Sequence, residues 1–274
     1  MRIVTDSSAD ILTLDGVDFA TAPLKIITAD REFVDDASLD VKEMVDYLAT
    51  YKGRSTTSCP NPDEWIRAFG EDSEIFCITI TSSLSGSFNS ANTAAKLYMK
   101  EHPERRVCMI DSLSTGPEMV LIMEKIVALI KDGKTFDEIE GEIMEYKKST
   151  GLIFMLESMN NLANNGRVSR LVAKFAGLLN IRVVARASDK GEIEPLDKPR
   201  GRRATVQKII DRLKELGYKG GKMRIAHCFN EDVALEIKAL VQSIYEKASI
   251  VIAKCGGLCS FYAERGGVLI GFEA

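Results

Sequence analysis

Ile75-Phe76-Cys77-Ile78-Thr79-Ile80 is a short apolar run, and Thr81-Ser82-Ser83-Leu84-Ser85-Gly86-Ser87 follows it directly. A brief run of apolar and β-branched residues is typical of a buried strand. The hydroxyl-rich stretch behind it contains residue types that begin helices, and the spacing predicts a helix over residues 87–99. Together these segments predict one strand-turn-helix unit of a parallel α/β domain.

Two similar strand candidates lie on either side of this unit. Residues 2–5 and 107–110 are β-branched runs that end in Asp6-Ser7-Ser8 and Asp111-Ser112. Polar residues at the carboxyl ends of parallel strands lie where open α/β sheets bind ligands, and they also cap the following helices. Helical spacing and caps predict helices at 41–51, 62–69, 117–131 and 136–147. The alternation predicts an N-terminal parallel α/β/α domain over residues 1–150.

The pattern changes after Gly151. Strand candidates at 178–187 and 192–196 flank Ser188-Asp189-Lys190-Gly191, which predicts a turn between antiparallel strands. Further strand candidates lie at 152–156, at 223–228 and in two segments near the end, and helical spacing covers 168–175, 205–216 and 232–244. We therefore expect a C-terminal α+β domain with an antiparallel sheet over residues 151–274.

The composition argues against several classes of protein. The chain has 274 residues, 45% of them hydrophobic and 28% charged, with a net charge of −4. These values are typical of a globular protein and not of a nucleic-acid-binding polycation. The apolar runs fall short of the roughly 20 residues that a membrane span needs, and the start shows no signal peptide. We expect a cytoplasmic monomer with no nucleic-acid partner and no membrane insertion.

The cysteines and histidines offer little for a metal site. Six cysteines lack a C-x-x-C pair, and the chain has two histidines. Cys255 and Cys259 could form a metal cluster with His227-Cys228, but reduced thiols in a cytosolic core are the preferred interpretation. Three aspartates could bind Mg²⁺ together, although helix capping explains them more simply; these are Asp6, Asp35 and Asp36. No metal is expected.

Three hydroxyl-rich segments precede predicted helices: Thr56-Thr57-Ser58-Cys59-Pro60-Asn61, Thr81 to Ser87, and Asp111-Ser112. Free backbone N–H groups beside hydroxyls can bind a carboxylate or phosphate without a formal cation. Gly86 would allow the ligand to approach the main chain closely. Because Ser and Thr are also common helix caps, a purely structural role stays open.

Catalysis by these hydroxyls would require a neighbouring base. His102 lies in a polar loop and His227 at the end of a strand, and the usual hydrolase, P-loop and metalloprotease motifs are missing from the sequence. An enzyme acting on a small carboxylate or phosphate remains the alternative function. In that case Asp111 or Asp6 would polarise Ser85 or Thr57.

Positive charge is concentrated in one segment. Residues 167–203 contain ten Lys or Arg and four Asp or Glu, a local charge of +6, so the rest of the chain carries −10. Such a separation can form a docking patch for an acidic partner or a phosphorylated ligand. A solvated rim of charged residues would give the same count.

Several segments occur in the order and spacing of one protein family, over nearly the whole chain. They are Thr5-Asp6-Ser7-Ser8, Pro23-Leu24 with Asp35, Thr57-Ser58-Cys59-Pro60-Asn61, Leu84-Ser85-Gly86-Ser87-Phe88-Asn89-Ser90-Ala91, Asp111-Ser112, Gly166-Arg167-Val168-Ser169, Leu178-Leu179-Asn180-Ile181, and the basic stretch 198–203. On these segments the sequence resembles the DegV family, including its FakB-like members.

The resemblance implies a two-domain DegV-type fold that binds a long-chain fatty acid, such as palmitate, in a tunnel between the domains. The family's carboxyl-binding hydroxyls match Thr57, Ser58 and Ser85 here, with Gly86 and Ser87 alongside. Tyr262 stands where the family generally has a histidine. These six residues are the expected ligand site.

The resemblance also implies a protein partner. FakB members present the fatty acid to a FakA-like fatty acid kinase, which phosphorylates the carboxylate with ATP to give acyl phosphate. Arg167, Arg200 and Arg202 match basic residues that we assign to the kinase-facing surface. On this basis the chain is a lipid-binding carrier and not an enzyme, with no catalytic residue and no cofactor besides the bound lipid.

Overall fold

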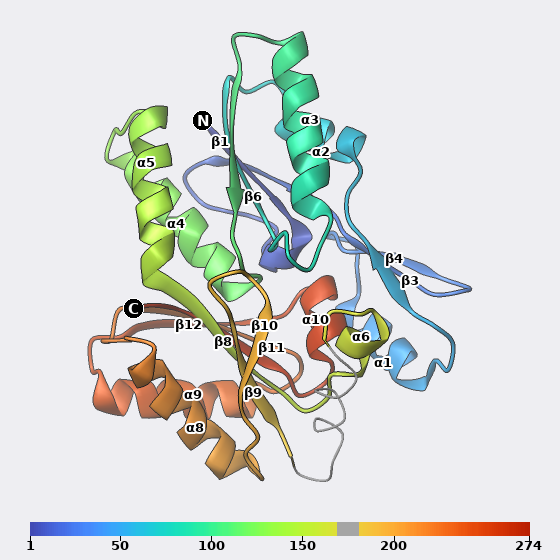
Figure 1. Ribbon diagram of the computed structural model, residues 1–274, viewed down its shortest axis with the longest axis vertical. Helices are drawn as coiled ribbons and strands as arrows, with labels where there is room; N and C mark the ends of the chain where they lie inside the picture. The colour runs from blue at the N-terminus through green and yellow to red at the C-terminus, as the bar shows by residue number, and fades with distance from the viewer. Residues whose placement is uncertain (169–180) are drawn as a thin grey trace.

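The first sheet of the protein is parallel and lies in the N-terminal part (Figure 1). The computed structural model describes residues 1–168 and 181–274. The strands β1 (Arg2–Asp6), β2 (Asp18–Ala22), β6 (Glu74–Thr79) and β7 (Arg106–Asp111) pair in the order β2-β1-β6-β7. All three pairings are parallel. The predicted parallel sheet is therefore confirmed, and β2 is a strand that the sequence did not predict.

Helices cover both faces of this sheet. On one face lie α2 (Pro62–Phe69) and α3 (Ser87–Glu101), whose Trp65, Phe69 and Tyr98 are buried against the strands. On the other face lie α4 (Pro117–Lys131) and α5 (Phe136–Tyr146), where Phe76 stacks on Phe136 with the ring centroids 4.6 Å apart. Apolar residues at helical spacing drive this burial, so the helices begin and end close to the predicted residues.

The N-terminal part also contains a small antiparallel sheet. It consists of β3 (Lys25–Ile27), β4 (Glu32–Val34) and β5 (Thr56–Ser58) in the order β4-β3-β5, and α1 (Val41–Thr50) connects β4 to β5. Each strand has three residues, too few for a recognisable alternation of polar and apolar positions. This sheet matters for function because β5 carries Thr57 and Ser58.

The second large sheet lies in the C-terminal part. Its strands are β8 (Thr150–Leu156), β9 (Val183–Ala187), β10 (Ile193–Asp197), β11 (Lys222–His227), β12 (Ser249–Lys254) and β13 (Val268–Glu273), in the order β10-β9-β8-β13-β11-β12. Four of the five pairings are antiparallel, as predicted. The β11–β12 pair is parallel because α9 (Glu231–Ile244) connects these strands as a crossover.

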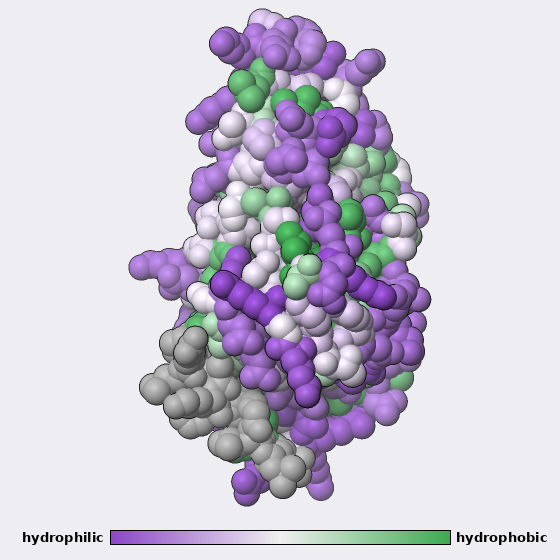
Figure 2. All heavy atoms as spheres, turned by 90° about the vertical axis from the view of Figure 1, so that its right-hand side faces the viewer, coloured by the Kyte–Doolittle hydropathy of each residue, from purple (hydrophilic) through white to green (hydrophobic). Residues whose placement is uncertain are grey.

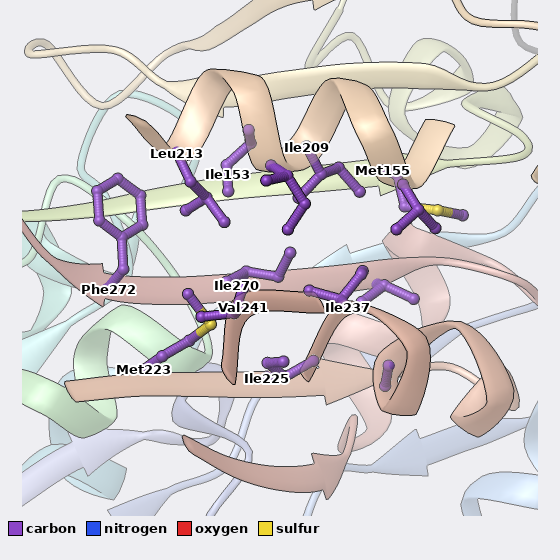
Figure 3. Packing of buried hydrophobic residues seen from close by; sticks show 14 of the residues in the cluster. Ile153, Met155, Ile209, Leu213, Met223, Ile225, Ile237, Val241, Ile270 and Phe272 are labelled. Carbon is purple, nitrogen blue, oxygen red and sulfur yellow. The ribbon is translucent and has the colours of Figure 1, made fainter. Parts of the chain in front are cut away.

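The helices α8 (Arg202–Glu215) and α9 cover one face of this sheet. Figure 3 shows Ile209 and Leu213 of α8 packed with Ile153 and Met155 of β8 in the resulting apolar core. The opposite face turns toward the N-terminal part, where α4 packs on β13 and β11. Helix α4 therefore lies between the two large sheets.

Shorter segments complete the description. They are the 3-10 turns η1 (Ser7–Ala9) and η2 (Lys147–Ser149) and the helices α6 (Asn160–Asn164) and α10 (Gly257–Ala263). The predicted helix at 168–175, together with Ser169 and the Leu178-Leu179-Asn180 part of the predicted strand, lies outside the described residues except for Val168. Among the helices that are described, each is too short or too polar to cross a membrane. The domain division at residue 150 stays a prediction.

Candidate functional site

A cavity lies between the C-terminal sheet and the loops that follow the N-terminal strands. Its empty space is about 820 Å³ when the open solvent at its mouth is counted, and the part that the centre of a water molecule can reach is about 110 Å³. Most of its wall is apolar, and the apolar side chains come from distant parts of the sequence. They include Leu24, Ile80, Leu84, Leu113, Leu152, Phe154, Leu156, Leu162, Ala187, Ile193, Leu258 and Leu269.

Strand β8 forms one side of this wall through its alternation. Successive side chains of a strand point to opposite faces, so Leu152, Phe154 and Leu156 face the cavity. The intervening Ile153 and Met155 point into the core under α8 and α9, as Figure 3 shows. Strand β8 is apolar on both faces because a helical layer covers one side and the cavity lies on the other.

Several polar residues line the cavity, and four of them form the group that we call its polar end: Thr57, Ser85, Arg167 and Tyr262. The other polar lining residues are Thr81, Ser114, Thr115 and Glu192. The hydroxyls of Thr57, on β5, and Tyr262, on α10, form a hydrogen bond of 2.7 Å. Ser85 and Arg167 line the same cavity. The Arg167 guanidinium lies 5.8 Å from the centroid of the Tyr262 ring, and its Nε donates to the carbonyl of Leu84 at 3.3 Å. Three uncharged hydroxyls and one cation thus meet at this end.

The environment keeps the Tyr262 phenol protonated. Tyr262 is largely buried, and burial raises its pKa, an effect only partly offset by Thr57 and Arg167. A phenol that stays neutral at physiological pH can donate one hydrogen bond to an anion. The cluster can therefore bind a carboxylate through neutral donors.

Ser87 has a different position from Ser85. Its buried hydroxyl donates to Asp6 Oδ2 at 2.6 Å, and the same carboxyl oxygen accepts from Ile80 N at 3.0 Å. Ser8 Oγ donates to the other oxygen of Asp6. Asp6 thus ties the loop before α3 to the end of β1, while burial raises the pKa of this carboxyl. Ser87 stabilises the loop and does not line the described cavity wall.

The start of α3 leaves backbone donors near Ser85. Gly86 is the residue before the helix and provides no side-chain cap. At the described helix start, the Ser85 hydroxyl accepts one hydrogen bond, which comes from Ser87 N at 3.2 Å. A Cβ at Gly86 would lie 3.3 Å from Cys59 Sγ. The first turn of α3 follows the cavity-lining Ser85 directly in the chain, and the N–H groups at a helix start favour an anion nearby.

The other predicted residues lie elsewhere. Ser58 is half-buried and pairs with Lys25 inside the small sheet. Arg200 is exposed, and Arg202 begins α8 and donates to Glu236 at 2.6 Å. The structure therefore brings Thr57, Ser85 and Tyr262 to one cavity. Arg167, a predicted residue of the kinase-facing surface, also lines this cavity.

The family segments in the sequence include Asp35, but they did not indicate that this residue anchors α10. Buried Asp35 accepts from Gly257 N at 2.7 Å and from Leu258 N at 2.9 Å, at the start of that helix. A Cβ at Gly257 would lie 2.5 Å from Asp35 Oδ1, so glycine is needed at this close approach. The signal available in the sequence was Gly256-Gly257 ahead of a short apolar segment, a weak sign of a helix start.

The contacts of the candidate acids do not support polarised serine chemistry. Asp111 accepts from the backbone N–H groups of Ser82 and Leu113, and the Asp6 contacts are those described above. Within residues 1–168 and 181–274, neither carboxylate hydrogen-bonds to Ser85 or Thr57. The same ranges contain no group of three or more metal-binding side chains.

The chain is similar to known proteins over its whole length. The model of the DegV family, described as uncharacterised protein, matches residues 1–274. A DegV domain-containing protein of Streptococcus pneumoniae is 41% identical over 99% of this chain and 98% of its own length. Both matches agree with the family resemblance stated from the sequence.

Two solved structures are similar to the whole chain. One is a DegV family protein from Eubacterium eligens, loaded with heptadecanoic acid. It is 45% identical to this chain with a TM-score of 0.98, and the match covers 100% of this chain and 99% of that protein's chain. The Fatty Acid Kinase (Fak) B3 protein of Streptococcus pneumoniae, loaded with linoleic acid, is 41% identical with a TM-score of 0.98, over 99% of this chain and 98% of its own.

Proposed function

This chain belongs to the DegV family, and from that premise we propose that it is a carrier of one long-chain fatty acid. The acyl chain occupies the cavity, and the carboxyl group binds at the Thr57, Ser85 and Tyr262 hydroxyls. The observation that carries this proposal is the combination of a long apolar wall with neutral donors at one end. The relatives loaded with heptadecanoic and linoleic acid support it.

The apolar wall accounts for the affinity. Burying roughly 16 carbons at about 0.8 kcal/mol each gives on the order of 12 kcal/mol before the costs of association. The polar end then needs only to orient the carboxyl group. Hydroxyls and backbone N–H groups do this, while the Arg167 guanidinium at the same end donates to the backbone carbonyls of Leu84 and Asn165.

That arrangement suits a substrate that another protein modifies. Because a relative 41% identical is named as a fatty acid kinase B3 protein, we infer that this chain presents its ligand to a kinase that transfers phosphate to the carboxylate. Arg167 lies at the polar end of the cavity, and the exposed Arg200 lies elsewhere on the surface. Cationic groups of this kind favour docking of an acidic partner surface or nucleotide phosphates.

Denaturing mass spectrometry of the purified protein tests the carrier function directly. We expect straight, branched or monounsaturated long-chain acids at close to one per chain. A protein that copurifies without lipid, and that does not take up palmitate when it is offered, would contradict the proposal.

Ser85→Ala tests the position of the carboxyl group. We expect fatty-acid binding to weaken by about 1–3 kcal/mol, because a carboxylate oxygen loses a donor in a buried site. The matched control is Ser82→Ala, an exposed serine three residues earlier in the same loop, which should leave binding unchanged. Equal affinity of the two variants for palmitate would mean that the carboxyl group lies elsewhere.

A further inference from the structure

We propose that Leu113, Leu152 and Ala187 form the end wall of the lipid cavity and set the longest acyl chain that the protein accepts. This inference rests on the proposed function and adds the position at which the acyl chain must end. It is carried by a second cavity that shares these three residues with the first.

The second cavity lies directly behind these side chains. It encloses about 1320 Å³ including open solvent, and its wall is much more polar than that of the lipid cavity. Glu118, Lys147, Thr150 and Arg186 contribute to it, and Thr150 Oγ1 donates to Glu118 at 2.7 Å. A methyl group entering this space would leave an apolar environment for water and charged groups. The end wall therefore separates a lipid compartment from a polar one.

The direction of β8 places this wall opposite the carboxyl end. Leu152 and Leu156 both face the lipid cavity, and the four residue steps from one to the other span about 13 Å of strand. Leu156 lies at the end of β8 nearest α6, and Arg167 follows α6 closely in the chain. Ala187 lies at the opposite end, because Arg186 pairs with Ile153, the neighbour of Leu152. The ligand carboxyl and its terminal methyl thus have separate, fixed positions.

Leu113 has a backbone conformation that marks it as unusual. Its φ is +55°, in the left-handed region that is unfavourable for a leucine. The neighbouring contacts maintain it: Asp111 Oδ1 accepts from Leu113 N at 3.0 Å, and Thr81 N donates to Ser114 O at 2.9 Å. A bulky side chain held at a position that favours glycine is consistent with a wall function.

Leu152→Ala tests the wall, with Leu156→Ala as the matched control. Both substitutions remove the same atoms from the same face of the same strand. Each additional buried methylene increases the affinity about fourfold. Room for two more carbons therefore changes the ratio of affinities for longer over shorter acids on the order of tenfold. We expect Leu152→Ala to shift preference toward longer acids by that factor. Leu156→Ala should weaken binding of all acids without a shift.

The measurement is competition among saturated acids from myristic to behenic, read by native and denaturing mass spectrometry. A second variant, Leu113→Gly, removes a wall side chain and suits the left-handed backbone, so it opens the wall without the strain of the parent. Ala187→Leu should shift preference toward shorter acids. If the parent protein binds these acids and the three wall variants keep its chain-length profile, the wall inference fails while the carrier function stands. If the parent binds none, the carrier function itself fails.

Discussion

The hydroxyls of Tyr262 and Thr57 share a single hydrogen bond, so the accepting hydroxyl keeps its own proton. That proton can be donated to a ligand. Because the pKa of Tyr262 is raised, the phenol stays neutral and does not repel a carboxylate. The pair thus acts as one neutral donor unit at the polar end of the cavity.

Tyr262→Phe removes one member of this unit while preserving the ring. We expect palmitate binding to weaken by about 1 kcal/mol, the typical value of one hydrogen bond, as measured by titration calorimetry. Tyr245→Phe is the control, because its hydroxyl donates to Tyr218 O away from the cavity. An affinity equal to that of the parent would show that the phenol does not reach the carboxylate.

Asp10 makes stability depend on pH. Burial and the nearby Asp35 raise its pKa well above the ordinary value of 3.8. The folded protein therefore keeps a proton on Asp10 at pH values where the unfolded chain releases it. The contribution of Asp10 to the free energy of unfolding is fully present below about pH 4, and it is lost as the pH rises through the pKa of Asp10 in the folded state.

Asp10→Asn should remove this part of the pH dependence. We expect the free energy of unfolding in urea, measured from about pH 4 to neutrality, to decline less with rising pH in the variant than in the parent. Asp15→Asn, at an exposed position, should follow the parent curve. If Asp10→Asn follows it too, Asp10 does not carry a shifted pKa.

Helix α10 depends on a residue far from it in sequence. Asp35 binds the first two N–H groups of a helix that carries Tyr262, so the small sheet region and the C-terminal part jointly position the phenol. Burial raises the pKa of Asp35, and the two N–H groups lower it in part.

Asp35→Ala should disturb both the helix and the site. We expect a loss of about 3 kcal/mol of unfolding free energy, because two buried donors lose their acceptor, together with weaker palmitate binding. Asp40→Ala, which removes the exposed cap of α1 at Glu43 N, should cost about 1 kcal/mol and leave lipid binding intact. Retained binding in Asp35→Ala would show that α10 is positioned by packing alone.

The long elements could be predicted from the sequence, whereas the site could be predicted only in part. Helices such as α2 and α4 have strong apolar periodicity and proline starts, so local signals define them. The three-residue strand β5 exists through its pairing with β3, a nonlocal contact that no local pattern reports. Its carboxyl-binding candidate Thr57 was found by motif resemblance and not by strand prediction.

Spacing alone could not separate Ser85 from Ser87. Both lie in one hydroxyl-rich loop, and the assignment depends on Asp6, which lies on a strand 81 residues away from Ser87 in the chain. Likewise, whether an apolar strand face of β8 packs on helices or lines a cavity depends on what covers that face. These features require the tertiary structure.

At the scale of the whole molecule, charge and surface polarity fit docking of a partner protein. The face seen in Figure 2 is mostly hydrophilic, with hydrophobic residues in small groups. The excess of Lys and Arg between residues 167 and 203 lies in a chain of net charge −4. Electrostatic steering by such a segment affects the rate of association more than the affinity.

Reversing Arg200 and Arg202 together to Glu should slow association with a fatty acid kinase by on the order of tenfold at low salt, as measured by surface plasmon resonance. The lipid cavity does not include them, so palmitate binding should be unchanged. The control is Lys214→Glu near the far end of α8, an exposed position. Equal association rates for the double variant and the parent would exclude this surface from docking.

The position of α4 between the two large sheets restricts how a ligand can enter. A Cβ at Gly271 of β13 would lie 2.5 Å from the backbone nitrogen of Glu118 at the start of α4, so main chain meets main chain across the junction. If the two large sheets moved apart as rigid bodies, this close packing between α4 and β13 would be lost. We therefore expect loading and release to proceed through local rearrangement at the mouth of the cavity and not through separation of the two sheets.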